Sequence, residues 1–94
     1  MRVADIINQK LNEALSPTIL EIIDDSHKHS GHAGARPEGE SHFSVTIVSE
    51  DFEGKSRVQR QRMVYRALSK EMTERIHALS LRTLAPSEEQ SRSL

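Results

Sequence analysis

Apolar side chains recur every three or four positions along the first fifteen residues, and this spacing predicts an amphipathic helix. The stripe consists of Val3, Ile6, Ile7, Leu11, Ala14 and Leu15. The helix should end at Ser16-Pro17, because a proline ring clashes with a continuing helical turn and disfavours the helical conformation in the residue before it.

Three later segments have the shorter period or the compact apolar run of a β-strand. Residues 18–25 bring Ile19, Leu20, Ile22 and Ile23 together, and residues 41–49 alternate Phe43, Val45 and Ile47 with polar positions. Residues 77–84 alternate again, with His77, Leu79, Leu81 and Thr83 on one face.

A helical period returns between the second and third predicted strands, over residues 56–76. Its apolar positions are Val58, Tyr65, Leu68, Met72 and Ile76, with possible breaks near Ser69 or Thr73. After the third strand, residues 86–90 offer a helix start, with Ser87 as the expected cap and Gln90 three residues later.

This order of elements predicts a mixed α/β (α+β) fold. The first two strands form an antiparallel hairpin, and a right-handed crossover through the helical segment places the third strand parallel to the second. Helices then cover one face of a three-stranded sheet. We expect one domain over residues 1–86, followed by a short helix or frayed tail over residues 87–94.

Composition supports a single small domain. The chain has 94 residues, of which 35% are hydrophobic and 3% aromatic, so the core is thin and aliphatic. With no cysteine, the chain has no thiol nucleophile and no thiolate ligand of its own. No apolar run reaches the roughly 18 residues of a membrane span, so we expect a cytoplasmic protein, although a mature organellar protein would look the same.

The net charge is only −1, but the positive charges are unevenly distributed along the chain. Residues 55–70 contain no acidic side chain and six basic ones: Lys55, Arg57, Arg60, Arg62, Arg66 and Lys70. Such a segment attracts phosphates, an acidic protein surface or an anionic peptide such as glutathione, or it is simply a solvated helix face. Aromatic residues that would stack on bases are nearly absent.

Histidines are the other candidates for chemistry. His27, His29 and His32 lie in a glycine-bearing loop between the first two predicted strands, where imidazole nitrogens could bind a metal or remain solvated. His77 opens the third predicted strand and is either a ligand or a half-buried core residue. The sequence contains no Gly-x-Ser-x-Gly, phosphate-binding glycine loop or His-Glu-x-x-His, so we expect no enzyme activity.

Several segments carry a resemblance to a known family, and together they cover nearly the whole chain. They are Leu20-Glu21-Ile22-Ile23-Asp24-Asp25-Ser26, Glu40-Ser41-His42-Phe43, Val48-Ser49 with Phe52-Glu53-Gly54-Lys55, Arg60-Gln61-Arg62-Met63-Val64-Tyr65 and Ile76-His77-Ala78-Leu79-Ser80-Leu81. In their order and spacing the chain resembles the BolA-like proteins. The resemblance implies an αββααβα plan similar to the class II KH fold.

The sequence departs from the family at two places. The family's usual Arg-His-Arg is Arg60-Gln61-Arg62 here, and the tryptophan that commonly follows the last strand is missing. The first difference removes a histidine from the helix, and the second affects the packing of the terminus.

The resemblance implies a partner of monothiol glutaredoxins that shares a 2Fe-2S cluster with the glutaredoxin and its glutathione, in cluster trafficking or iron homeostasis. His77 matches the family's C-terminal histidine ligand. In the loop His32 matches best and His29 is the alternative. The same resemblance implies a second function, a DNA-binding transcriptional regulator that uses Lys55, Arg57, Arg60, Arg62 and Arg66. The chain has no Gly-x-x-Gly loop between helices, which is where KH domains carry it.

Overall fold

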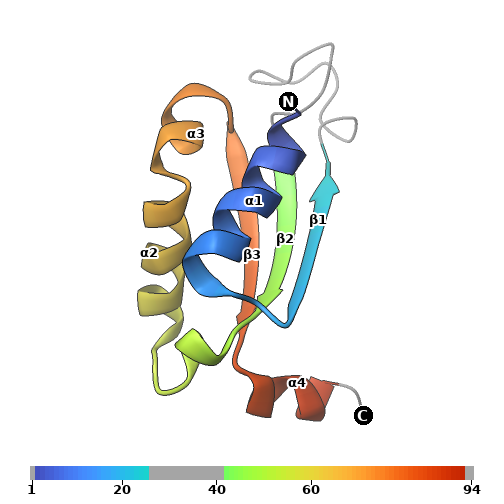
Figure 1. Cartoon of the computed structure of the whole chain (residues 1–94), viewed down its shortest axis with the longest axis vertical. Helices are drawn as coiled ribbons and strands as arrows, with labels where there is room; N and C mark the ends of the chain where they lie inside the picture. The colour runs from blue at the N-terminus through green and yellow to red at the C-terminus, as the bar shows by residue number, and fades with distance from the viewer. Residues whose placement is uncertain (1, 26–41, 93–94) are drawn as a thin grey trace.

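The computed structural model describes residues 2–25 and 42–92. Their helices and strands follow the predicted order (Figure 1). These are α1 (Val3–Leu15), β1 (Ile19–Asp24), β2 (His42–Val48), the short 3-10 helix η2 (Glu50–Phe52), α2 (Arg57–Ala67), α3 (Ser69–Glu74), β3 (Ala78–Leu84) and α4 (Pro86–Arg92). None of the helices among these residues is long and apolar enough to cross a membrane.

The sheet has the order β1-β2-β3, with β1 antiparallel to β2 and β3 parallel to β2. This confirms the predicted mixed sheet and the helical crossover. In Figure 1, α1 lies across one face of the sheet and α2 runs beside it, next to β3. β1 and β3 are the two edge strands of the sheet.

The core lies between α1, α2 and the covered face of the sheet. From α1 it takes four fully or nearly fully buried residues at helical spacing: Val3, Ile7, Leu11 and Leu15. Ala14, predicted to share this stripe, is exposed. The alternation predicted for the second strand is confirmed, because Phe43, Val45 and Ile47 are all buried. Helix α1 ends where expected, with Ser16 in the left-handed conformation before Pro17.

Helix α2 buries a different face from the predicted one. Val58 is 54% exposed and Tyr65 is 38% exposed, whereas Arg60 and Val64 are buried. The predicted apolar stripe was therefore wrong in this helix, because it left out a position whose polar side chain is satisfied inside the protein. The break predicted near Ser69 is confirmed, since α2 ends at Ala67 and α3 begins at Ser69.

The boundaries of the last two elements also differ from the prediction. Strand β3 begins at Ala78, so His77 precedes it. Helix α4 begins at Pro86, a residue well suited to the first helical position because its missing N–H is not needed there. Ser87 is therefore not the cap. Instead, the Glu88 carboxylate accepts a hydrogen bond from the Ala85 backbone N–H at 2.8 Å.

Candidate functional site

Two histidines meet at one end of the sheet. β2 begins at His42, which is in register with Ala78 at the start of the parallel strand β3, so His77 comes directly beside it. The ring centroids of His42 and His77 are 5.2 Å apart and the rings are tilted by 48°. His42 is only 6% exposed, whereas His77 is exposed. The pair thus has one imidazole packed in the protein and one presented to solvent.

The segment between β1 and β2 leaves and re-enters the sheet at this same end. The Asp25 backbone N–H donates to the His42 carbonyl at 2.7 Å, and the Ser44 hydroxyl donates to the Asp25 carboxylate. The predicted loop ligands His27, His29 and His32 lie outside the described residues. The end of β1 and the start of β2 lie at the same end of the sheet as His77, with Asp25 bonded to His42 and His42 beside His77.

Two imidazoles can bind one metal centre when their nitrogens converge. The centroids of His42 and His77 are 5.2 Å apart, which is an ordinary separation for two packed rings. Among residues 2–25 and 42–92, no group of three or more histidine, aspartate or glutamate side chains is arranged to hold a metal ion. A complete site therefore needs donors from the loop or from a partner.

Sequence reasoning named His77 but did not include His42 among the ligands. The signal was present in the sequence, because His42 and His77 both stand at the start of a predicted strand and those strands were predicted to be parallel. Aligning the two starts would have brought the histidines together.

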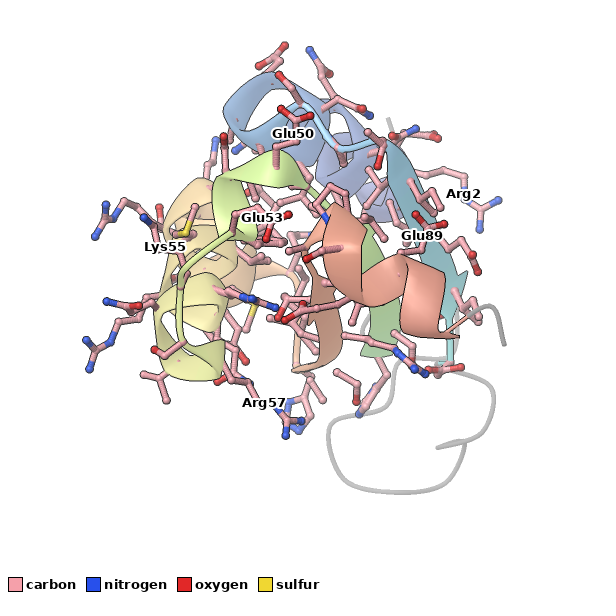
Figure 2. All side chains as sticks on the ribbon, turned by 90° about the horizontal axis from the view of Figure 1, so that it is seen from below. Arg2, Glu50, Glu53, Lys55, Arg57 and Glu89 are labelled. Carbon is pink, nitrogen blue, oxygen red and sulfur yellow. The ribbon has the colours of Figure 1, made fainter. Side chains whose placement is uncertain are left out.

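The predicted basic surface divides into two parts. Lys55, Arg57, Arg62 and Arg66 are exposed, and Figure 2 shows Lys55 and Arg57 projecting away from the body of the molecule. Arg60, predicted as one of the binding residues, is 8% exposed. Lys70, in the same basic segment, is also exposed, so five of its six basic side chains are available to a partner.

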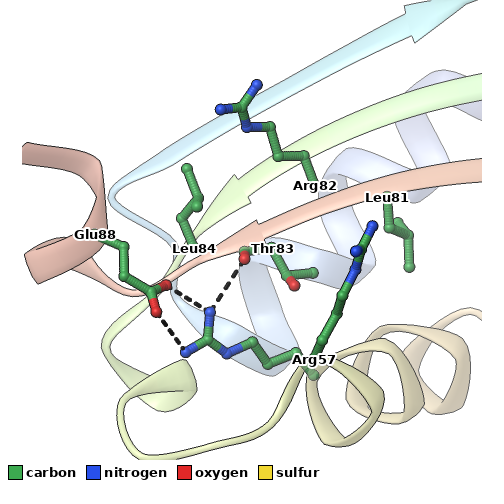
Figure 3. Close-up of a pocket in the computed structure, with 7 residues that line it drawn as sticks. Arg57, Leu81, Arg82, Thr83, Leu84 and Glu88 are labelled. Atoms are coloured by element: carbon green, nitrogen blue, oxygen red, sulfur yellow. Dashed lines mark hydrogen bonds and ion pairs between the residues drawn. The ribbon is translucent and has the colours of Figure 1, made fainter. Parts of the chain in front are cut away.

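Arg60 joins α2 to the end of β3 and to α4. Its guanidinium donates to the Lys55 carbonyl at 3.0 Å. It also donates to the Thr83 carbonyl at 3.2 Å and to both oxygens of the Glu88 carboxylate at 2.6 and 3.1 Å, the bonds drawn in Figure 3. It also lies 5.8 Å from the centroid of the Phe52 ring. Hydrogen bonds from Arg60, and then from the Ala85 backbone N–H, hold the pKa of Glu88 below its ordinary value. Arg60 is thus occupied by bonds within the protein.

A second ion pair fastens α3 to α1. Lys10 Nζ lies 2.9 and 2.7 Å from the two oxygens of Glu71, which is 4% exposed. Burial on its own would raise the pKa of Glu71, but the hydrogen bond from Lys10 and the backbone bond outweigh it and lower the pKa overall. This pair is structural and lies apart from the histidines.

Comparison with known proteins gives a family match over most of the chain. The family model described as BolA-like protein matches residues 11–88. The chain is 44% identical over 91 residues to the chloroplastic protein BOLA1 of Arabidopsis thaliana, covering 95% of this chain and 57% of that protein. It is 40% identical over 83 residues to the DNA-binding transcriptional regulator BolA of Escherichia coli, covering 88% and 75% respectively.

Another relative is much longer than this chain. The chain is 43% identical over 86 residues to the chloroplastic and mitochondrial SufE-like protein 1 of Arabidopsis thaliana, but it spans 23% of that protein. Among solved structures, the BolA domain of SufE1 from Arabidopsis thaliana matches with a TM-score of 0.81 at 41% identity, over 90% of this chain and 93% of that one.

Proposed function

The chain belongs to the BolA-like family, and we propose that it is the histidine-bearing partner of a monothiol glutaredoxin, with which it shares a 2Fe-2S cluster in iron-sulfur trafficking or iron homeostasis. The observation that carries the proposal is the exposed His77, packed against the buried His42 at the end of the sheet from which the histidine-bearing loop extends. The proposed role is binding rather than catalysis.

The proposed ligands from this chain are His77 and one loop histidine, His32, with His29 as the alternative. His42 is a further imidazole close enough to support His77 or to contribute a nitrogen. The chain contains no cysteine, so the thiolate donors come from the glutaredoxin and from glutathione. Histidine ligation raises the reduction potential of a 2Fe-2S cluster relative to ligation by cysteine alone.

The test reconstitutes the complex from this chain, a monothiol glutaredoxin, iron, sulfide and glutathione. We expect a heterodimer that absorbs visible light, and we expect His77→Ala to lose that absorption while its far-UV circular dichroism is unchanged, because the exposed imidazole contributes little to the core. Ser80→Ala is the matched control, since Ser80 is exposed on the same strand. A wild-type cluster spectrum in His77→Ala contradicts the assignment.

DNA binding is the second candidate function. It is supported by the names of two relatives, the DNA-binding transcriptional regulators BolA of Escherichia coli and Haemophilus influenzae, at 40% and 39% identity. The exposed residues Lys55, Arg57, Arg62 and Arg66 would contact phosphates. Selection on randomised duplexes at physiological salt tests this function. Gln59 and Gln61 of α2 could read adenine if the helix entered a major groove, so enrichment of a defined motif that is lost in variants of either residue would support it.

A further inference from the structure

A groove of about 430 Å³ runs along the outer edge of β3. Four consecutive strand residues, 81–84, line it, together with Arg57 and Arg60 from α2 and Glu88 from α4. Neighbouring side chains of a strand point to opposite faces of the sheet. A groove that touches four consecutive residues must therefore lie against the edge of the strand, where the backbone itself is accessible.

The hydrogen bonds at the end of β3 show which backbone groups face this edge. The Leu84 carbonyl accepts from the Ser49 backbone N–H at 3.0 Å, which places the polar groups of Leu84 on the β2 side. Because these groups alternate along a strand, those of Thr83 and Leu81 point outward. The bond from Arg60 to the Thr83 carbonyl agrees with this direction. This bond occupies the Thr83 carbonyl, so a segment that pairs with the outer edge of β3 would begin at Leu81.

The charges around the groove favour an acidic occupant. Arg57 and Arg82 are both exposed, and Figure 3 shows them on either side of the β3 ribbon. Arg60 and Glu88 neutralise each other by their ion pair at 2.6 Å, so the positive charge of the two exposed arginines is unbalanced in the groove. A second copy of this chain pairing edge to edge would bring arginines against arginines, which disfavours self-association.

We propose that the outer edge of β3 at Leu81 pairs with an extended acidic segment of a partner protein. The partner's backbone adds a strand to the sheet, and acidic side chains on neighbouring positions, which point to opposite faces, meet Arg82 and Arg57. Backbone hydrogen bonds supply the attraction common to all such segments, and the two arginines supply the preference for acidic ones. This inference does not depend on the cluster-sharing proposal.

The probe is a fluorescein-labelled heptapeptide with a central Asp-Glu pair flanked by valine and threonine, titrated into the full chain by fluorescence anisotropy. We expect saturable binding that Arg82→Glu and Arg57→Glu each weaken by about tenfold, because each places an anion opposite the peptide's own. Arg62→Glu is the control on the same helix as Arg57. Since Arg62 does not line the groove, its variant should bind within about twofold of the wild type.

Two further measurements separate strand addition from simple charge attraction. The same peptide N-methylated at alternate residues cannot donate the ladder hydrogen bonds and should not bind, while amide exchange at Leu81 should slow when the unmodified peptide is added. The proposal is overturned if the methylated peptide binds equally well or if a Lys-Lys version binds as tightly as the Asp-Glu version. It is also overturned if a DNA duplex binds this edge and the acidic peptide does not.

Discussion

Truncating Arg60 should lower the stability of the protein far more than truncating any exposed arginine in the same segment. Arg60→Ala removes the donor to two backbone carbonyls, those of Lys55 and Thr83. A hydrogen bond to a charged group contributes about 1.5–3 kcal/mol, and water admitted after truncation recovers part of it. The bonds to Glu88 add little to this sum, since that carboxylate is almost half exposed and screened by solvent.

We therefore expect Arg60→Ala to lower the free energy of unfolding by about 3 kcal/mol, from the two carbonyl bonds and the lost packing of the aliphatic stem. For a domain of this size that corresponds to a fall in Tm of about 15 °C. The free energy of unfolding of Arg60→Lys should lie between those of the wild type and Arg60→Ala, because an ammonium group cannot reproduce the planar fork that reaches several acceptors.

Urea and thermal unfolding followed by far-UV circular dichroism measure this effect, with Arg62→Ala as the exposed control. If Arg60→Ala and Arg62→Ala destabilise equally, or if Arg60→Ala loses less than about 1 kcal/mol, the buried network is not holding α4 and β3 as described. The outcome also matters for function, since a loss of partner or DNA binding in an Arg60 variant would otherwise be mistaken for a lost contact.

Three other predictions concern titration, ligation and salt. The folded pKa of Glu71 is below its unfolded value, so the carboxylate stabilises the fold fully above about pH 5, and this stabilisation is lost as pH falls through the folded pKa. The free energy of unfolding, measured with urea across this pH range, should lose this pH-dependent part in Lys10→Met. His32→Ala should diminish the cluster absorption of the glutaredoxin complex more than His29→Ala or His27→Ala does, and wild-type spectra in all three variants would exclude the loop as a ligand source. If DNA is bound, Arg62→Ala should reduce the slope of log affinity against log salt by about 0.9, whereas a protein interface should respond more gently.

Much of the fold follows from periodicity, and the exceptions have identifiable physical causes. The alternation of Phe43, Val45 and Ile47 was sufficient to orient β2, because each apolar side chain is buried in the core. In α2 the same reasoning failed, since a hydrophobic stripe cannot include an arginine. Arg60 can be buried because its guanidinium makes four hydrogen bonds, and three of them go to Thr83 and Glu88, which lie far away in the sequence.

The candidate site was predicted less completely than the fold. His77 was identified from its place at the start of a predicted strand and from the resemblance to the family. Its contact with His42 could have been predicted by aligning the starts of the two parallel strands, but the separation and tilt of the rings depend on the packing of the folded protein. The cap of α4 was missed for a similar reason. Ala85 has no capping side chain, and a carboxylate three residues later takes that role while it also pairs with Arg60.

The parallel pairing of β2 with β3 places both proposed binding regions along the same strands. His42 and His77 lie at the amino ends, and the proposed pairing begins at Leu81, three steps from the first residue of β3, or about 10 Å. Because the bond from Arg60 closes the edge at Thr83, an added strand would extend from Leu81 toward the histidines. Under the two proposals, a protein at the histidines and a segment on β3 would therefore compete for space, and their binding free energies would not simply add.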